Sequence, residues 1–542
     1  MDASATTPAG APAESSAGLS IAGQLRRKAR LIGLLFASTT SIIGSGWLFG
    51  AFHATRIAGP LAIWSWVVGA IIIMLIALCF AELGAMFPRS GALVHMSHAC
   101  HGAGLGRLWA WLLFLGYVST PAVESEAVVT YANNYWPVLV NSHGVLTGVG
   151  FAVCLALMVV MVLINLLAVE LLLRVNSTIT WWKIAVPALT GIVLLLAGTH
   201  WGVMKADPTG YKFSGIFTAM PTAGVIFSYL GFRTAIDLGG ESANPRRHIP
   251  MAVIGSVALS AAIYILLQLA FLSALRPSDL AHGWASLSFV GMSGPFAGLA
   301  SALGIGWLAT LLYIDAFVSP GGTGLMSVTA GSRILFAIGD MGAGPNWLTK
   351  LTGIKIPWAS VLMMWVLGML FLLPFPSWTL LVGYITAVAV LTYGLGPIAL
   401  LVLRRNLPHG HRAFELKGGQ VIATLAFVCC NWVIYWTGFK TDSWLFGIAA
   451  IVFILDVLYY QIGNNPWRDF GWRNIVWLLP WFAGLWVLSG VSNIGGGAGL
   501  IGFWPGVVLV AVWSLIVIRL AMRAALGVPE TAAMMARMEN TS

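Results

Sequence analysis

The chain has 542 residues, of which 59% are hydrophobic and only 8% are charged. Average soluble domains carry about 25% charged and roughly 45–50% apolar residues, so a chain of water-soluble domains is excluded. One transmembrane helix needs about 20 apolar residues, and this chain has room for many. Its apolar runs, such as Ala70–Phe80 and Phe151–Ile164, are continuous rather than alternating, which excludes an outer-membrane β-barrel.

These runs predict an all-α polytopic membrane protein with about 14 transmembrane helices. In chain order the predicted spans are 31–54, 60–84, 108–136, 146–168, 177–199, 215–240, 250–274, 300–337, 358–375, 378–402, 420–439, 443–462, 475–491 and 502–522. Around them we expect four parts: a disordered cytoplasmic N-terminal tail (1–27), a ten-span core (28–405), four additional helices (406–525) and an unstructured cytoplasmic C-terminal tail (526–542).

The basic residues set the predicted orientation, because cytoplasmic loops retain an excess of Lys and Arg. With a cytoplasmic N-terminus, most of the 28 Lys and Arg residues fall on the cytoplasmic side. The exceptions that face outward are Arg56, Lys205, Lys212, Arg276 and Lys440. We therefore expect a multi-pass protein of the cell (inner or plasma) membrane with both termini in the cytoplasm. The net charge of +10 is spread too sparsely for nucleic-acid binding.

The sequence lacks the signatures of ATP-driven pumps and of common enzymes. It contains no Gly-Lys-Ser/Thr, no His-Glu-x-x-His and no Gly-x-Ser-x-Gly. His95, His98, Cys100 and His101 could place ligands on one helical face, but no carboxylates accompany them. We expect a loop helix there, no metal, no cofactor and no enzymatic activity.

Two predicted spans are interrupted by glycine, at Ser41–Gly46 in the first span and at Phe227–Arg233 in the sixth. Glycine in a membrane helix can simply allow close packing. Two interruptions at corresponding positions five spans apart instead favour an inverted-repeat secondary transporter with a site near the membrane midplane. There, free N–H groups bind an anion and free carbonyls bind a cation. The two breaks can thus hold both the carboxylate and the ammonium of an amino acid.

At these residues the chain resembles the amino acid–polyamine–organocation transporter superfamily. The segments that carry the resemblance are Gly44–Phe49, Phe80–Gly91, Phe227–Pro250 and Ser332–Phe336. The later segments Gly304–Thr310, Leu373–Trp378 and Tyr435–Lys440 most resemble bacterial aspartate–proton symporters. The resemblance implies a five-plus-five inverted-repeat core with broken spans 1 and 6.

The resemblance also implies a substrate site that is built from the two breaks. Its residues are Ile42, Gly44, Ser45, Gly46, Phe227, Leu230, Gly231 and Arg233. The amides of Ser45 and Gly46 would hold the substrate carboxylate, and the carbonyls of Ile42, Phe227 and Leu230 would hold the ammonium. The ring of Phe227 matches the aromatic lid that closes over bound substrate.

Ionisable residues at membrane depth are costly and are therefore candidate functional groups. Lys183 matches the fifth-span lysine of proton-coupled members, where sodium-coupled relatives bind a cation between the first and eighth spans; snorkelling toward the cytoplasm is the alternative. We predict that Lys183 is the proton-coupling group and that Glu124, which matches a subfamily glutamate, relays a proton. Glu126 faces another side of the helix, and Asp315 is either a structural partner or a gate.

Arg233 follows the second break and has two interpretations. Facing the site, its guanidinium would select an acidic substrate, because it binds a carboxylate in a two-pronged fork. Facing along the helix, it would pair with Asp237, one turn on.

The sequence therefore predicts a proton-coupled symporter that imports an amino acid, aspartate or glutamate, by alternating access. Its expected partners are the small-molecule substrate, protons and the lipid bilayer, with the oligomeric state open. The alternatives are a neutral amino-acid or polyamine carrier or exchanger and, in a different class, a transporter-like nutrient sensor or channel.

Overall fold

The computed structural model describes residues 30–87, 92–142, 144–167, 169–198, 200–202, 212–289, 294–352, 356–373, 377–408, 412, 414–463 and 466–540. The N-terminal tail that we expected to be disordered (1–27) lies outside these residues. Within them, the regular structure consists of helices, with no strand beyond isolated bridges. The prediction of an all-α chain is confirmed.

The first five predicted spans are helical. The elements are α1 (Leu31–Ile42), α2 (Gly46–Ala58), η2 (Gly59–Leu61), α3 (Ala62–Met86), α4 (Ala92–Ala132), α5 (Gly148–Leu167) and α6 (Val169–Ala197). α1 and α2 are the two halves of the broken first span. α4 is longer than predicted, because it includes the expected loop helix and continues across Gly102, whose positive φ of 81° marks a kink.

The next five spans follow the same order. The elements are α7 (Gly215–Thr222), α8 (Val225–Tyr229), α9 (Thr234–Asp237), η5 (Gly239–Glu241), α10 (Pro245–Ala274), η6 (Pro277–Leu280), η7 (Trp284–Ser286), α11 (Pro295–Ala302), α12 (Gly306–Asp340), η8 (Asn346–Thr349), α13 (Trp358–Leu372) and α14 (Trp378–Asn406). α7, α8 and α9 make up the broken sixth span, and α12 is the long eighth span.

The remaining elements lie beyond the ten-span core. They are α15 (Gly419–Thr437), α16 (Phe439–Ile462), η9 (Trp467–Phe470), α17 (Trp472–Ile475), α18 (Leu478–Val491), α19 (Phe503–Ala524) and α20 (Val528–Asn540). By length and composition, 10 helices of the described residues can cross a membrane, or 11 if the pair α7 and α8–α9, bent by 58°, is one span. This count joins α2 to α3, and it omits the shorter helices α1 and α13 as well as the long α12. Every predicted span nevertheless contains helix among its described residues.

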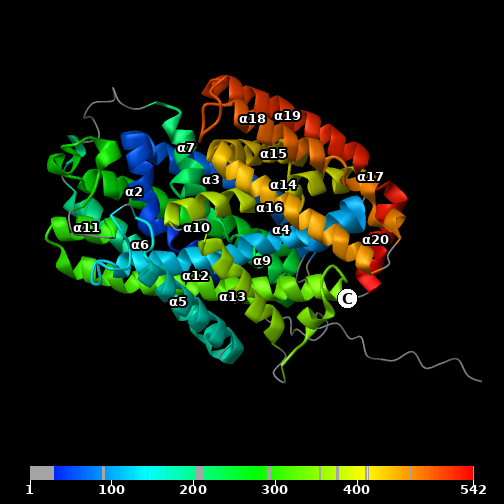
Figure 1. The fold of residues 1–542 in the computed structure, drawn as a ribbon, viewed down its shortest axis with the longest axis horizontal. Coiled ribbons are helices and arrows are strands. Elements are labelled where there is room, and N and C mark those ends of the chain that lie inside the picture. The colour runs from blue at the N-terminus through cyan, green and yellow to red at the C-terminus, as the bar shows by residue number, and fades with distance from the viewer. Residues whose placement is uncertain are drawn as a thin grey trace, which may run out of the picture.

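The helix contacts repeat with a period of five spans. α3 packs on α10, α4 on α12 and α5 on α13, while α2 contacts α7 and α1 contacts α9. Each of these pairs joins a span to its counterpart five spans later, and Figure 1 shows the long α4 and α12 side by side. The same symmetry relates the α3–α14 contact to the α10–α6 contact, because each joins the second span of one repeat to the fifth span of the other. Two five-span repeats related by a two-fold axis require this pattern.

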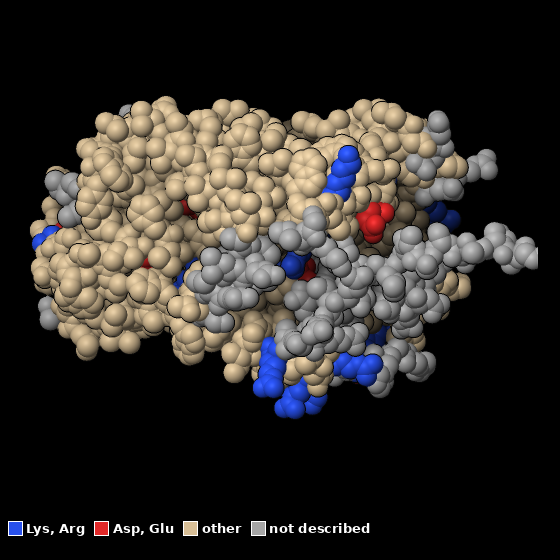
Figure 2. Space-filling model, turned by 90° about the horizontal axis from the view of Figure 1, so that it is seen from below, with Lys and Arg blue, Asp and Glu red and all other residues tan. Residues whose placement is uncertain are grey.

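The surface is poor in charge, as a lipid-facing surface must be. In the view of Figure 2, large areas carry no Lys, Arg, Asp or Glu side chain. Several large apolar side chains are exposed on the outer helices, among them Leu167, Leu196, Ile462 and Leu479, each more than 70% exposed. Their exposure is explained by a hydrocarbon solvent rather than by water.

The expectation that the C-terminal tail is unstructured is wrong, because residues 528–540 form α20, which packs on α4 and α14. The side-chain amide of Asn406 donates to the Thr531 hydroxyl at 2.9 Å and to the Leu526 carbonyl at 2.8 Å. The Leu526 amide donates to the carbonyl of Cys100 at 2.9 Å. These bonds supply tertiary support that the composition of the segment does not reveal.

Candidate substrate-binding and coupling site

The first span unwinds where the sequence predicts it. α1 ends at Ile42, Ile43 has non-helical angles (φ −82°, ψ 89°), and α2 begins at Gly46. The Ile42 carbonyl accepts from the amide of Gly44 at 3.1 Å and from the Tyr264 hydroxyl at 3.3 Å. The break thus exposes main-chain groups to side chains of neighbouring helices.

The sixth span also unwinds. After α8, Leu230 is extended (φ −67°, ψ 153°) and Gly231 has a φ of 106°, which L side chains rarely adopt. The Phe227 carbonyl accepts from the Leu230 amide at 3.1 Å. The ring of Phe227 stands edge-on to Trp378 with centroids 6.1 Å apart, and only 7% of the residue is exposed.

The two breaks lie against each other, and their glycines permit this contact. A Cβ on Gly46 would lie 2.3 Å from the Ser228 hydroxyl oxygen, and a Cβ on Gly231 would lie 2.6 Å from the Ser41 carbonyl oxygen. Unwinding and close packing, the two alternative interpretations of these glycines, therefore occur together at this point. The structure brings the predicted segments Ser41–Gly46 and Phe227–Arg233 into contact.

The start of α2 already has a carboxyl group as its partner. The Ser45 amide donates to Glu124 Oε2 at 2.9 Å, and the indole Nε1 of Trp378 donates to the Ser45 hydroxyl at 3.0 Å. Glu124 has no exposed surface. A carboxylate at a helix N-terminus is favoured by the free N–H groups and the helix dipole. One of the amides that the resemblance assigns to substrate is thus bound to a protein side chain.

Lys183 lies between the first and eighth spans. Its ammonium donates to the Thr40 carbonyl at 2.9 Å and to the Thr323 hydroxyl at 2.7 Å. Lys183 has no exposed surface, so the snorkelling interpretation is wrong. The Thr40 hydroxyl is hydrogen-bonded in turn to that of Thr180. A carbonyl in the last turn of α1 and a hydroxyl are oxygen ligands for a cation, and here they accept hydrogen bonds from the ammonium.

Asp315 is also buried, on the same helix as Thr323. Its Oδ1 accepts from the Trp182 indole at 2.7 Å and from the Ser319 hydroxyl at 2.8 Å, whereas Oδ2 has no hydrogen-bond partner among the described residues. Asp315 and Glu124 are the two carboxylates that interact electrostatically with Lys183. Among the described residues, two carboxylates thus lie near the one ammonium of Lys183.

Arg233 contacts Asp237 through a tyrosine rather than directly. Its Nε donates to the Tyr117 hydroxyl at 3.0 Å, and that hydroxyl donates to Asp237 Oδ2 at 2.6 Å. The guanidinium lies 4.3 Å from the ring centre of Tyr117 and 5.5 Å from that of Tyr393. Its Nη1 is buried without a hydrogen-bond partner among the described residues. The Nη1 group of the Arg233 guanidinium is therefore free to donate a hydrogen bond.

The other acidic and histidine candidates lie apart from this cluster. Glu126 is 1% exposed, and one of its carboxylate oxygens has no hydrogen-bond partner in the described part of the chain. His101 bonds the Ala521 carbonyl at 3.0 Å, and Cys100 bonds that of Ala399 at 3.7 Å. No group of three or more potential metal ligands occurs among the residues that the structure describes.

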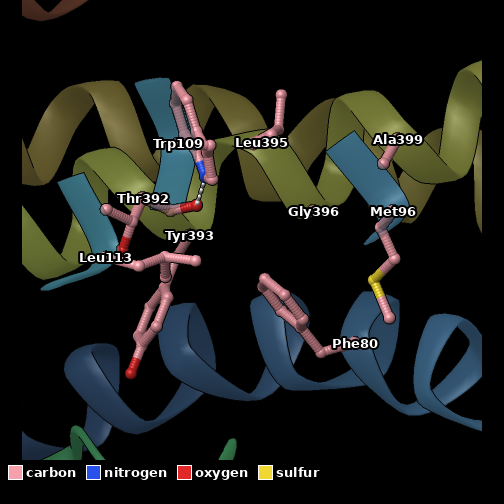
Figure 3. A pocket seen from close by; sticks show the side chains of 9 residues that line it. All are labelled: Phe80, Met96, Trp109, Leu113, Thr392, Tyr393, Leu395, Gly396 and Ala399. Atoms are coloured by element: carbon pink, nitrogen blue, oxygen red, sulfur yellow. Dashed lines mark hydrogen bonds between the residues drawn. The ribbon is translucent and has the colours of Figure 1, made fainter. Parts of the chain in front are cut away.

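Two cavities lie outside the breaks. Figure 3 shows the first, between α3, α4 and α14, where the Trp109 indole donates to the Thr392 carbonyl at 3.1 Å. Its volume of about 10 Å³ is near the minimum for a single water molecule. The second, about 340 Å³ between α4, α5 and α12, is lined by apolar residues and Trp136. Neither has a charged group that could pair with an amino acid.

Comparison with known proteins agrees with this architecture. The family model described as amino acid permease matches residues 30–488. A glutamate/serine transporter of Bacillus subtilis is 37% identical over 508 residues, covering 91% of this chain and 93% of the relative.

Two further relatives come from the same organism. An aspartate-proton symporter of Bacillus subtilis is 32% identical over 501 residues, which cover 91% of this chain and 95% of the relative. A branched-chain amino acid permease of Bacillus subtilis is 25% identical over 433 residues, which cover 77% and 89%. The chain therefore belongs to the amino acid permease family of the amino acid–polyamine–organocation superfamily, whose members are multi-pass membrane transporters and not enzymes.

Proposed function

We propose that this transporter is a proton-coupled symporter that imports an acidic amino acid, aspartate or glutamate, by alternating access. We place it in the cell membrane with both termini in the cytoplasm, the orientation that the distribution of Lys and Arg favours. Ten spans (28–405) form the transport core, and residues 406–525 supply four further helices.

Proton coupling is supported above all by the placement of Lys183. Its ammonium bridges the Thr40 carbonyl of the first span and the Thr323 hydroxyl of the eighth. A lysine that loses its proton gives up the charge that these oxygens stabilise, so the bond between the two spans weakens. Protonation of Lys183 thus favours one arrangement of the broken first span, and alternating access requires such a two-state element.

An acidic substrate is supported by Arg233, which directly follows the second break. Its buried guanidinium has an unused donor, Nη1, and a substrate carboxylate would satisfy it. The names of two relatives agree, since one is a glutamate/serine transporter and the other an aspartate-proton symporter.

Uptake into proteoliposomes under an imposed pH gradient tests the proposal. We expect labelled L-aspartate to accumulate when the outside is acidic and to be competed by L-glutamate. In Lys183→Ala, accumulation should lose its dependence on the gradient, whereas the exposed Lys440→Ala is the matched control and should retain it. Gradient-dependent accumulation in Lys183→Ala would refute the coupling role. Passive leak would indicate a channel, and binding without transport a sensor.

A neutral substrate is the second candidate, because the relative with 37% identity is named for serine as well as glutamate. The main-chain groups of the two breaks serve the carboxylate and ammonium that all α-amino acids share. Competition of aspartate uptake by a panel that includes serine, leucine and a polyamine decides between these substrates.

A further inference from the structure

The Ser45 amide can donate its hydrogen bond to only one carboxylate at a time, and it already donates to Glu124. The Glu124 Oε2–Ser45 N distance is 2.9 Å, and α2, the 13-residue helix that begins next to it, directs its positive dipole end toward the carboxylate. The side chain has no exposed surface, and its second oxygen, Oε1, has no hydrogen-bond partner among the described residues.

Glu124 reaches the main chain of the break because no side chain intervenes. A Cβ on Gly44 would lie 2.5 Å from Glu124 Oε1 and 3.2 Å from its Cδ. The carboxylate therefore fills the space beside the break that glycine leaves free. A second carboxylate at the same amide would be a like charge within contact distance, which disfavours ionisation of one of the two.

Several other groups face Glu124. Lys183 on α6 attracts it electrostatically, and the Tyr264 hydroxyl on α10 lies within electrostatic range. Thr323 on α12 is neutral and lies beside the same break. Asp315 on α12 faces Lys183. Lys183 is already hydrogen-bonded to Thr40 and Thr323, with no ion pair to Glu124 within 4 Å among the described residues.

We propose that Glu124 is a built-in competitor for the substrate: its carboxylate occupies the Ser45 amide in the empty site, and the α-carboxylate of an incoming amino acid displaces it. Once displaced, Glu124 has lost its N–H donor and faces a second carboxylate. It then takes one proton from the water on the open side of the membrane, so that COO⁻ becomes COOH.

Binding of substrate and uptake of a proton thereby become one linked event. Deprotonated Glu124 occupies the Ser45 amide, to which the substrate carboxylate would bind. Protonated Glu124 leaves that amide free for the substrate. This inference rests on the proposed function, because it requires an α-amino acid as ligand. It does not depend on an acidic side chain, because the α-carboxylate is common to all amino acids.

The test measures binding and proton uptake together. Wild-type protein in lipid nanodiscs is titrated with L-aspartate and with L-serine between pH 6 and pH 8, in weakly buffered solution with a pH indicator. We expect about one proton to be taken up per amino acid bound at pH 8 and progressively less toward pH 6, with Kd rising with pH by up to about tenfold per unit. In Glu124→Gln, binding should take up no proton, and Kd at pH 8 should match the wild-type value at pH 6.

Glu126→Gln is the matched control, since it removes a buried carboxylate from the same helix two residues away; it should behave as wild type. If Glu124→Gln keeps both the proton uptake and the pH-dependent Kd, the inference is wrong. Binding to wild type without proton uptake overturns it as well, and this result needs no variant. If neither probe binds to wild type, the proposed function fails, and the inference falls with it.

Discussion

At the scale of single residues, the environment of Lys183 shows what a sequence can and cannot reveal. A lysine in the middle of an apolar span is conspicuous, because charge at membrane depth is costly. Thr40 and Thr323, which accept its hydrogen bonds, are ordinary residues for a membrane helix and carry no signal of their own. Only the packing of the first, fifth and eighth spans brings these three residues together.

Arg233 provides the prediction at this scale. In Arg233→Gln we expect kcat/KM for L-aspartate to fall by roughly 10- to 100-fold, because loss of a hydrogen bond to a charged group costs about 1.5–3 kcal/mol. Uptake of L-serine should change far less, since serine has no side-chain carboxylate to pair with the arginine. Initial rates of uptake into proteoliposomes measure both substrates.

Arg233→Lys is the accompanying variant, and it should retain part of the aspartate uptake, since it keeps the charge without the two-pronged fork. Equal losses for aspartate and serine in Arg233→Gln would assign the arginine to a structural role with Tyr117 and Asp237.

At the scale of elements, the two broken helices could be predicted because their cause is local. Glycine permits the backbone angles of Gly231 and the close approach at Gly46, and both residues are visible in the sequence. The docking of α20 could not be predicted, because it depends on Asn406, about 120 residues earlier in the chain. The bond from Ser45 to Glu124 was missed for the same reason, since it joins residues 79 positions apart.

The close contact between the two breaks, at Gly46 and Ser228, can be tested by substitution. Gly46→Ala places a methyl group 2.3 Å from the Ser228 hydroxyl oxygen, and overpacking of this kind costs about 1–3 kcal/mol. We expect a lower thermal midpoint and a loss of uptake. Adding Ser228→Gly removes the atoms that clash and should restore part of both.

Thermal denaturation in detergent and uptake into proteoliposomes are the two readouts, with Ser228→Gly alone as the matched control. A double variant that is no better than Gly46→Ala would show that the methyl group is harmful for a reason other than its contact with Ser228.

At the scale of the whole molecule, a buried ion pair and a hydrogen bond to a buried carboxylate join the segments after residue 405 to the ten-span core. Arg107 on α4 pairs with Asp456 on α16 at 2.7 Å. Glu82 on α3 accepts from Arg404 on α14 at 2.6 Å and from the Leu416 amide, which precedes α15, at 2.9 Å. The additional helices are therefore attached through charges inside the protein rather than through lipid-facing contacts alone.

Removal of one partner of such a pair is far more costly than loss of an exposed pair. In Asp456→Asn the guanidinium of Arg107, a residue only 8% exposed, remains buried without its counter-ion, which costs about 3–5 kcal/mol. We expect a strongly reduced thermal midpoint but an unchanged KM for uptake by the folded fraction, because α16 does not contribute to the two breaks.

Asp279→Asn is the matched control, because it removes the acidic partner of the Arg276–Asp279 ion pair. The Arg276 side chain is 37% exposed, and such exposed pairs contribute about 0–1 kcal/mol. Similar losses of stability in the two variants would mean that the later helices do not depend on the buried charge for their attachment.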